Sequence, residues 1–95
     1  MEDVLWYLLA SSRGGATRAR VLRLLDERPR NANELAEAMD VHYTTVRHHL
    51  DVLEENNVVR SAGEGYGAPY LLTDHVETHR EELETVLDTV DSEKP

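Results

Sequence analysis

Apolar residues recur at helical spacing along most of the chain, and short polar or glycine-rich breaks separate the runs. The first run covers residues 4–12 and ends at the break SRGG, and the second covers residues 16–28 and ends at Pro29. Each run places apolar side chains three or four positions apart, so each predicts a short amphipathic helix.

Two further helices are predicted after Pro29, with a tight turn between them. Residues 31–39 begin with Asn31 and carry Glu34 three positions later, which is the spacing of a capping box. A second helix is predicted from about residue 43 to residue 56. Two short helices joined by such a turn are typical of a helix-turn-helix, here over residues 31–56.

A β-hairpin is predicted next, over residues 58–73. Its two runs are VVRSA and APYLLT, which are extended in pattern, and the glycine-rich GEGYG between them forms the turn. The last run, residues 74–90, predicts one acidic helix with Asp74 and Glu77 spaced as its cap. This order predicts a mainly α fold with a small β-hairpin, a single winged helix-turn-helix domain over residues 1–95 with extra N- and C-terminal helices.

The amino-acid composition excludes several classes of site and function. The chain has no cysteine, which excludes disulfides, thiolate metal sites and cysteine nucleophiles. It also has no nucleophile with a paired base, no phosphate-binding loop and no HExxH motif, so we expect no enzyme, cofactor or small-molecule substrate. No apolar run approaches the roughly 20 residues that span a bilayer, so we expect a cytoplasmic protein with no membrane partner.

The net charge of -9, taken alone, argues against a nucleic-acid partner. However, nine of the ten basic residues are arginine, and the composition resembles that of proteins from salt-loving archaea, whose acidic surfaces keep them hydrated. The acids also gather in residues 74–95, where eight acidic residues face two basic ones. One interpretation is that these acids form a solvated helix face. The other is that they lie away from the surface that binds a polyanionic partner.

The segment NELAEAMDVHYTTVRHHLDVLEENNVV (33–59) resembles the helix-turn-helix of the ArsR-type winged-helix transcriptional regulators. The positions that match the family pattern are Glu34, Leu35, Ala36, Val41, Thr45, Val46, His49, Leu50, Leu53 and Val59. Asp40 replaces the usual turn glycine, His42 replaces the capping serine, and Asn57 replaces the glycine before the wing, where asparagine tolerates a left-handed backbone. The family's cysteine metal box is absent. The resemblance therefore implies a DNA-binding repressor fold, and it does not imply metal sensing.

Three histidines in VHYTTVRHHL (41–50) raise the question of a metal site. His48 and His49 are adjacent, so their side chains diverge by about 100°, and His42 lies two turns, about 10 Å, from His49. Neither pair can chelate one ion, so no metal site is expected here. The helical spacing instead predicts that His49 points inward as a structural residue.

The outward face of this helix is the principal candidate for DNA contact, because the second helix of a helix-turn-helix enters the major groove. Tyr43, Thr44 and Arg47 are expected nearest the base edges, and Arg47 can bond guanine O6 and N7 together. His42 at the helix start and His48 are better placed for phosphate. The alternative is an ordinary solvated face.

Four residues outside the helix-turn-helix face complete the predicted DNA surface. Arg60 at the base of the wing is expected to meet phosphate, and Tyr66 at its tip to pack on a sugar or the backbone, although the nearby Glu64 would repel phosphate. Arg18 and Arg30 are candidate backbone contacts. The alternative to this predicted DNA contact of the wing is a flexible turn that contacts nothing.

The apolar stripes of the two terminal helices, residues 1–12 and 74–91, suggest a two-fold dimer interface. The predicted interface residues are Leu5, Trp6, Leu8, Leu9, Val76, Leu83, Val86, Leu87 and Val90. Packing of both helices within one monomer is the alternative. His75 and His79 have ligand spacing but lack further partners for a complete metal site.

The sequence therefore predicts a homodimeric, sequence-specific regulator that binds double-stranded DNA. A winged-helix module for protein–protein contact within a transcription or replication assembly is the main alternative. A nonspecific chromatin-type protein is a second, against which the single lysine argues.

Overall fold

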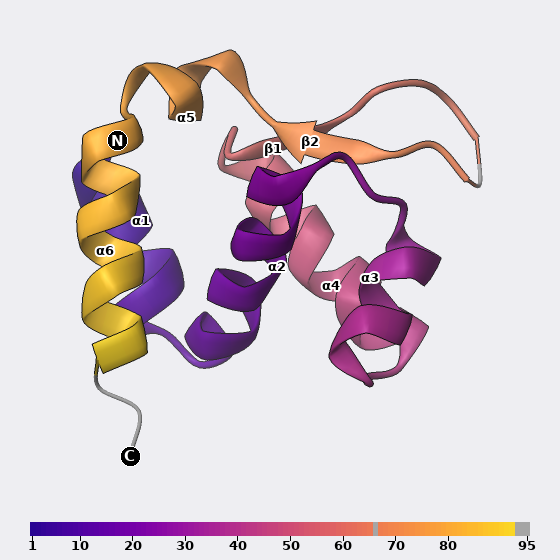
Figure 1. Ribbon diagram of the computed structural model, residues 1–95, viewed down its shortest axis with the longest axis horizontal. Coiled ribbons are helices and arrows are strands. Elements are labelled where there is room, and N and C mark those ends of the chain that lie inside the picture. The colour runs from indigo at the N-terminus through magenta and orange to yellow at the C-terminus, as the bar shows by residue number, and fades with distance from the viewer. Residues whose placement is uncertain (66, 93–95) are drawn as a thin grey trace.

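The computed structural model describes residues 1–65 and 67–92, in which one β-hairpin projects from a group of helices (Figure 1). The elements in chain order are α1 (Glu2–Trp6), the π-helical turn η1 (Tyr7–Ser11), α2 (Gly15–Glu27), α3 (Ala32–Met39), α4 (Tyr43–Glu55), β1 (Val59–Ser61), β2 (Tyr70–Leu72), α5 (Asp74–Thr78) and α6 (Arg80–Ser92). This order confirms the predicted winged helix-turn-helix with added terminal helices. None of the described helices has the length and apolar character needed to cross a membrane.

Local sequence signals set the boundaries of the helix-turn-helix. The Asn31 side chain accepts a hydrogen bond from the Glu34 amide at 2.8 Å, and the Glu34 carboxylate accepts one from the Asn31 amide at 2.9 Å, which confirms the capping box of α3. Asp40 ends α3 in the left-handed region at φ 55°, and Asn57, also left-handed at φ 60°, turns the chain from α4 into the wing. These turns place α3 against α4.

The wing is a short antiparallel ladder anchored to the rest of the domain. Its register pairs Val59 with Leu72 and Ser61 with Tyr70. Tyr70 also forms a bridge with Arg30, in the connection between α2 and α3. The hairpin thus continues into the body of the domain at its base, while its tip extends beyond α3 (Figure 1).

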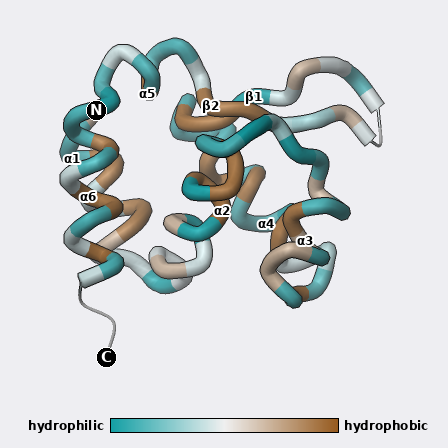
Figure 2. Tube along the Cα trace, in the orientation of Figure 1, coloured by the Kyte–Doolittle hydropathy of each residue, from teal (hydrophilic) through white to brown (hydrophobic). Residues whose placement is uncertain are grey.

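The predicted dimer-interface residues lie in the interior of a single chain, because α1 and η1 pack against α6. Of the predicted interface residues, seven are at most 1% exposed, namely Leu5, Leu8, Leu9, Val76, Leu83, Val86 and Leu87. Val90 is 7% exposed, and Trp6 is half-buried. The eight buried residues therefore cannot form the predicted interface, since a side chain without accessible surface cannot contact a second copy, whereas Trp6 keeps part of its surface exposed. The apolar residues of α2 lie in the middle of the same core (Figure 2).

The predicted C-terminal helix is two helices rather than one. His79, at φ -107° and ψ 36°, separates α5 from α6. The cap is Thr73 and not Asp74, because the Thr73 hydroxyl accepts a hydrogen bond from the Val76 amide at 3.1 Å. That hydroxyl also donates to the Asn57 carbonyl at 2.8 Å, so the cap ties α5 to the start of the wing.

Candidate nucleic-acid interface

The first two turns of α4 present the predicted DNA-contacting side chains on one outward face. His42, Thr44 and His48 are exposed, and Tyr43 and Arg47 are half-buried beside the wing. The opposite face carries the buried residues Val46, His49, Leu50 and Leu53. Helical periodicity thus produces the division of α4 that the sequence predicts. His42 occupies the cap position without a side-chain cap bond, so its imidazole takes no part in capping α4.

Arg47 does not extend freely from α4 but lies between the helix and the wing. One terminal nitrogen donates a hydrogen bond to the Tyr70 hydroxyl, and the other donates to the Asp51 carboxylate at 3.3 Å. The guanidinium carbon is 5.8 Å from the centre of the Tyr70 ring, within cation–π range. The hydrogen bond with Tyr70 raises the pKa of Arg47, so this guanidinium remains a fixed positive charge. The side chain is still 38% exposed and accessible to a ligand.

A pocket of about 350 Å³ opens between the start of α3, the start of α4 and the wing. We call it the helix–wing notch. Its lining residues are Asn31, Ala32, Asn33, Tyr43, Arg47, Gly65, Ala68 and Tyr70. Amide, phenol and guanidinium groups of this kind contact phosphate oxygens and base edges in protein–DNA complexes. The notch therefore adds asparagines from α3 to the surface expected from α4 alone.

Tyr70 is the residue of this site that the sequence analysis missed. It is only 7% exposed, and its backbone exchanges two hydrogen bonds with Arg30, at 3.2 and 2.8 Å. Arg47 and Tyr70 are 23 positions apart in the chain, so no local periodicity links them. A hydroxyl-bearing aromatic in the second strand of the wing is the only sequence signal that could have drawn attention to it.

Arg18 is buried rather than available to DNA, which corrects its predicted phosphate contact. The residue is 4% exposed, and its guanidinium donates to the carbonyls of Leu8 at 2.8 Å and Arg13 at 3.0 Å. It also bonds the Ser12 hydroxyl and lies 3.2 Å from His49 Nδ1. Burial lowers the pKa of Arg18. Its donors satisfy carbonyl groups at the end of η1 and in the following turn instead of a phosphate.

Arg30 is similarly engaged within the chain. Its side chain is 12% exposed and donates to the Leu24 carbonyl at 3.1 Å and the Glu27 carboxylate at 2.7 Å. The predicted phosphate contact of Arg30 is therefore corrected, since its guanidinium is largely buried and bonds groups of its own chain. Arg60, by contrast, is exposed on β1, and no ion pair involves it within residues 1–65 and 67–92. Tyr66, the predicted contact at the wing tip, lies outside the described residues.

His49 points into the core, as its spacing predicts, and is 8% exposed. Burial lowers the pKa of His49, and the charges of Arg18 and His48 lower it further. The other histidine pair lies in α5 and at its end, where His79 Nδ1 bonds the His75 carbonyl at 2.8 Å. Across the described part of the chain, no three His, Cys, Asp or Glu side chains are grouped to hold a metal ion.

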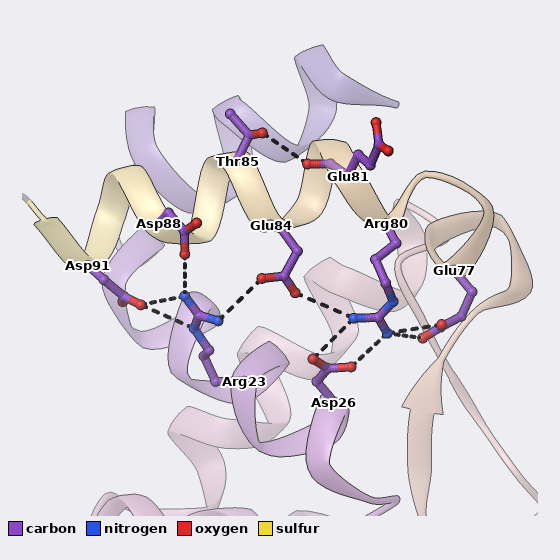
Figure 3. Close-up of polar contacts among 9 residues, drawn as sticks. All are labelled: Arg23, Asp26, Glu77, Arg80, Glu81, Glu84, Thr85, Asp88 and Asp91. Atoms are coloured by element: carbon purple, nitrogen blue, oxygen red, sulfur yellow. Dashed lines mark hydrogen bonds and ion pairs between the residues drawn. The ribbon is translucent and has the colours of Figure 1, made fainter.

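Ion pairs join α2 to α6 and hold three of the acidic residues of α6 (Figure 3). Arg23 contacts Asp91 at 2.6 Å, Asp88 at 3.2 Å and Glu84 at 3.8 Å. Arg80 contacts Asp26 at 2.7 Å, Glu77 at 2.9 Å and Glu84 at 3.4 Å. We call these seven residues the α2–α6 charge network. It joins α2 to a helix at the opposite end of the molecule from α3, so this excess of negative charge lies away from the helix-turn-helix (Figure 1).

Comparisons with known proteins agree with the fold. The family described as "Helix-turn-helix domain" matches residues 16–62, from α2 to the end of β1. The structure of a mutant of ZitR from Lactococcus lactis is similar with a TM-score of 0.59 and 17% identity, over 95% of this chain and 75% of that one. The structure of transcriptional regulator PA3341 is similar with a TM-score of 0.58 and 25% identity, over 95% of this chain and 69% of that one.

Comparison with the curated proteins finds no match. The family match covers the part of the chain that builds the helix–wing notch from the helix side, and the structural matches extend to the wing and the terminal helices. The chain therefore has the winged helix-turn-helix fold.

Proposed function

We propose that this protein is a sequence-specific transcriptional regulator of the ArsR type that binds double-stranded DNA as a homodimer. The observation that carries the proposal is the outward face of α4, which gathers His42, Thr44, Arg47 and His48 beside the helix–wing notch. The similarity to transcriptional regulator PA3341 supports the same class of function. In this arrangement α4 enters the major groove and the wing follows the adjacent backbone.

The roles within this face follow from reach and chemistry. Arg47 donates to guanine O6 and N7, and Tyr43 and Thr44 offer hydroxyl groups and apolar surface to neighbouring bases. His42, at the start of α4, and His48 approach phosphates. Arg60 on the exposed face of β1 contacts the backbone next to the groove.

Selection of random duplexes by the purified protein tests this proposal. We expect an enriched motif, and we expect Arg47→Ala to flatten the preference at one base pair of that motif. Arg23→Ala is the matched control, because it removes the same charge from the α2–α6 charge network. Selection without an enriched motif would favour the protein–protein module. Selectivity that survives Arg47→Ala would show that another residue reads the base.

The salt dependence of binding provides a second test. A chain with net charge -9 gains little from counterion release, so base contacts and DNA shape must supply more of the affinity. We expect a shallower loss of affinity with salt than a basic repressor shows. A steep negative slope of log K against log salt would contradict this expectation and would favour mainly phosphate contact.

The homodimer that we propose needs a different surface from the buried stripe of α6. Val4 is 36% exposed and Tyr7 is 64% exposed, so the first two helical segments present an apolar surface next to the half-buried Trp6. We expect light scattering to give the mass of a dimer, and we expect the two recognition helices of that dimer to lie about 34 Å apart. Tyr7→Glu should give a monomer, whereas Ala38→Glu on exposed α3 should not. An unchanged dimer mass for Tyr7→Glu would exclude this surface.

A further inference from the structure

Tyr70 is the point at which three parts of the domain meet. Its backbone pairs with Ser61 in the wing and with Arg30 in the connection between α2 and α3. Its hydroxyl accepts a hydrogen bond from Arg47 of α4. One residue therefore joins the wing, the entry to α3 and the helix proposed to read DNA, and it is itself buried in the core.

Arg47 is held from two sides by this arrangement. A guanidinium has five N–H donors, of which each terminal nitrogen supplies two. Tyr70 takes a donor from one terminal nitrogen of Arg47, and Asp51 takes one from the other. Each terminal nitrogen therefore keeps a second hydrogen, and two donors in a plane are what guanine O6 and N7 accept.

Holding the side chain in advance also affects how selectively it binds. A free arginine samples many rotamers, and fixing one of them on binding costs conformational entropy. In this chain the bond with the buried Tyr70 hydroxyl and the bond with Asp51 already restrict Arg47 before any ligand is present. Such pre-organisation lowers the cost of binding and penalises a base that does not match the fixed donors.

We propose that Tyr70 is a positioning residue that sets the direction of Arg47 and thereby the base preference of the protein. We assign Tyr70 no base contact of its own, because it is only 7% exposed where it lines the helix–wing notch. The inference rests on the proposed function, and it adds that base selectivity is decided partly in the wing and not in α4 alone.

The test is Tyr70→Phe, which keeps the ring, its packing and both backbone bonds with Arg30 and removes only the hydroxyl. Affinities are measured against the selected duplex and a panel that carries each other base at the Arg47 position. We expect discrimination at that base pair to fall about tenfold, with discrimination at other positions unchanged. A merely structural role would instead lower the melting temperature and weaken all duplexes equally. Thr85→Val, which removes a hydroxyl from exposed α6, is the control.

A double-mutant cycle decides whether Tyr70 acts through Arg47. Arg47→Ala and Tyr70→Phe should affect the same base pair, and the double variant should discriminate no worse than Arg47→Ala alone. Arg47→Lys is a second probe, because a lysine cannot be held in a plane from two sides, and it should lose the same preference. The inference would be overturned if the losses of discrimination from Arg47→Ala and Tyr70→Phe add in the double variant. It would also be overturned if Tyr70→Phe or Arg47→Lys discriminates between bases as the wild type does. A wild-type protein that selects no motif would instead refute the proposed function, and with it this inference.

Discussion

Arginine holds α2 to its neighbours in two places, and the two places differ in their access to water. Arg18 is buried and joins α2 to the end of η1 and to His49 of α4. Arg23 is 36% exposed and joins α2 to three carboxylates of α6. Within the described residues, Arg18 has no carboxylate partner, so carbonyl oxygens, a hydroxyl and an imidazole surround its charge.

The difference shows that the density of ion pairs is a poor guide to where stability lies. An exposed ion pair contributes about 0–1 kcal/mol, because water and salt screen it. A buried cation has lost several kcal/mol of hydration, and the groups that replace water around it are left unpaired when it is removed. We therefore expect the Arg18 site to matter more to folding than the larger α2–α6 charge network.

Replacement of Arg18 should have the largest effect. Arg18→Ala leaves the Leu8 and Arg13 carbonyls without their donor and opens a cavity beside His49. We expect the free energy of unfolding to fall by about 3 kcal/mol, measured by urea denaturation. Arg23→Ala is the matched control on the same helix. A loss below about 1 kcal/mol for Arg18→Ala would remove the contrast between the two sites.

Crowding at the Arg18 site predicts the next largest effect. Gly14 has φ 85°, and a Cβ there would lie 2.6 Å from His49 Cε1 and 3.0 Å from Arg18 Nη1. We expect Gly14→Ala to cost about 2 kcal/mol or more, the sum of backbone strain and displaced side chains. Gly65, with φ 97° and no atom within 4 Å of such a Cβ, is the control, and its alanine variant should cost about 1 kcal/mol. Equal losses of unfolding free energy for Gly14→Ala and Gly65→Ala would show that backbone strain, and not crowding against His49 and Arg18, causes the effect.

The Arg18 site should also make stability depend on pH near neutrality. The pKa of His49 is lowered in the folded protein, so the unfolded chain binds a proton first as the pH falls. Stability is therefore complete above the ordinary histidine pKa of about 6.5 and decreases as the pH falls below it. We expect a lower urea midpoint at pH 5.5 than at pH 7.5. His49→Gln should reduce this difference, whereas exposed His42→Gln should not. If the urea midpoint falls between pH 7.5 and pH 5.5 by the same amount in both variants, a group other than His49 causes the pH dependence.

The smallest effect is expected in the α2–α6 charge network. Arg23→Ala should lower the free energy of unfolding by at most about 1 kcal/mol in dilute buffer. In about 1 M salt the screening length falls to roughly 3 Å, so the loss should nearly disappear. Exposed Arg20→Ala is the control for removing a charge from α2. A loss that persists in high salt would mean that Arg23 stabilises the contact through packing of its alkyl chain.

Where the sequence analysis succeeded, the signals were local. The capping box of Asn31 and Glu34, the left-handed Asn57 and the inward His49 each depend on residues within a turn or two. The C-terminal helix shows the limit of that approach, because Thr73 and Asp74 are both acceptable caps in sequence. Thr73 caps α5 because its hydroxyl also reaches the Asn57 carbonyl, which is distant in the chain.

The sequence by itself determined the order of the elements and which face of each helix avoids water, because both follow from short-range periodicity and turn chemistry. It did not determine what each buried face packs against. The stripe of α6 meets α1 and η1 of the same chain instead of a second copy, Arg18 is enclosed, and Arg47 meets Tyr70. Only the tertiary structure decided these contacts, because hydrophobic burial has no direction and many partners can satisfy it.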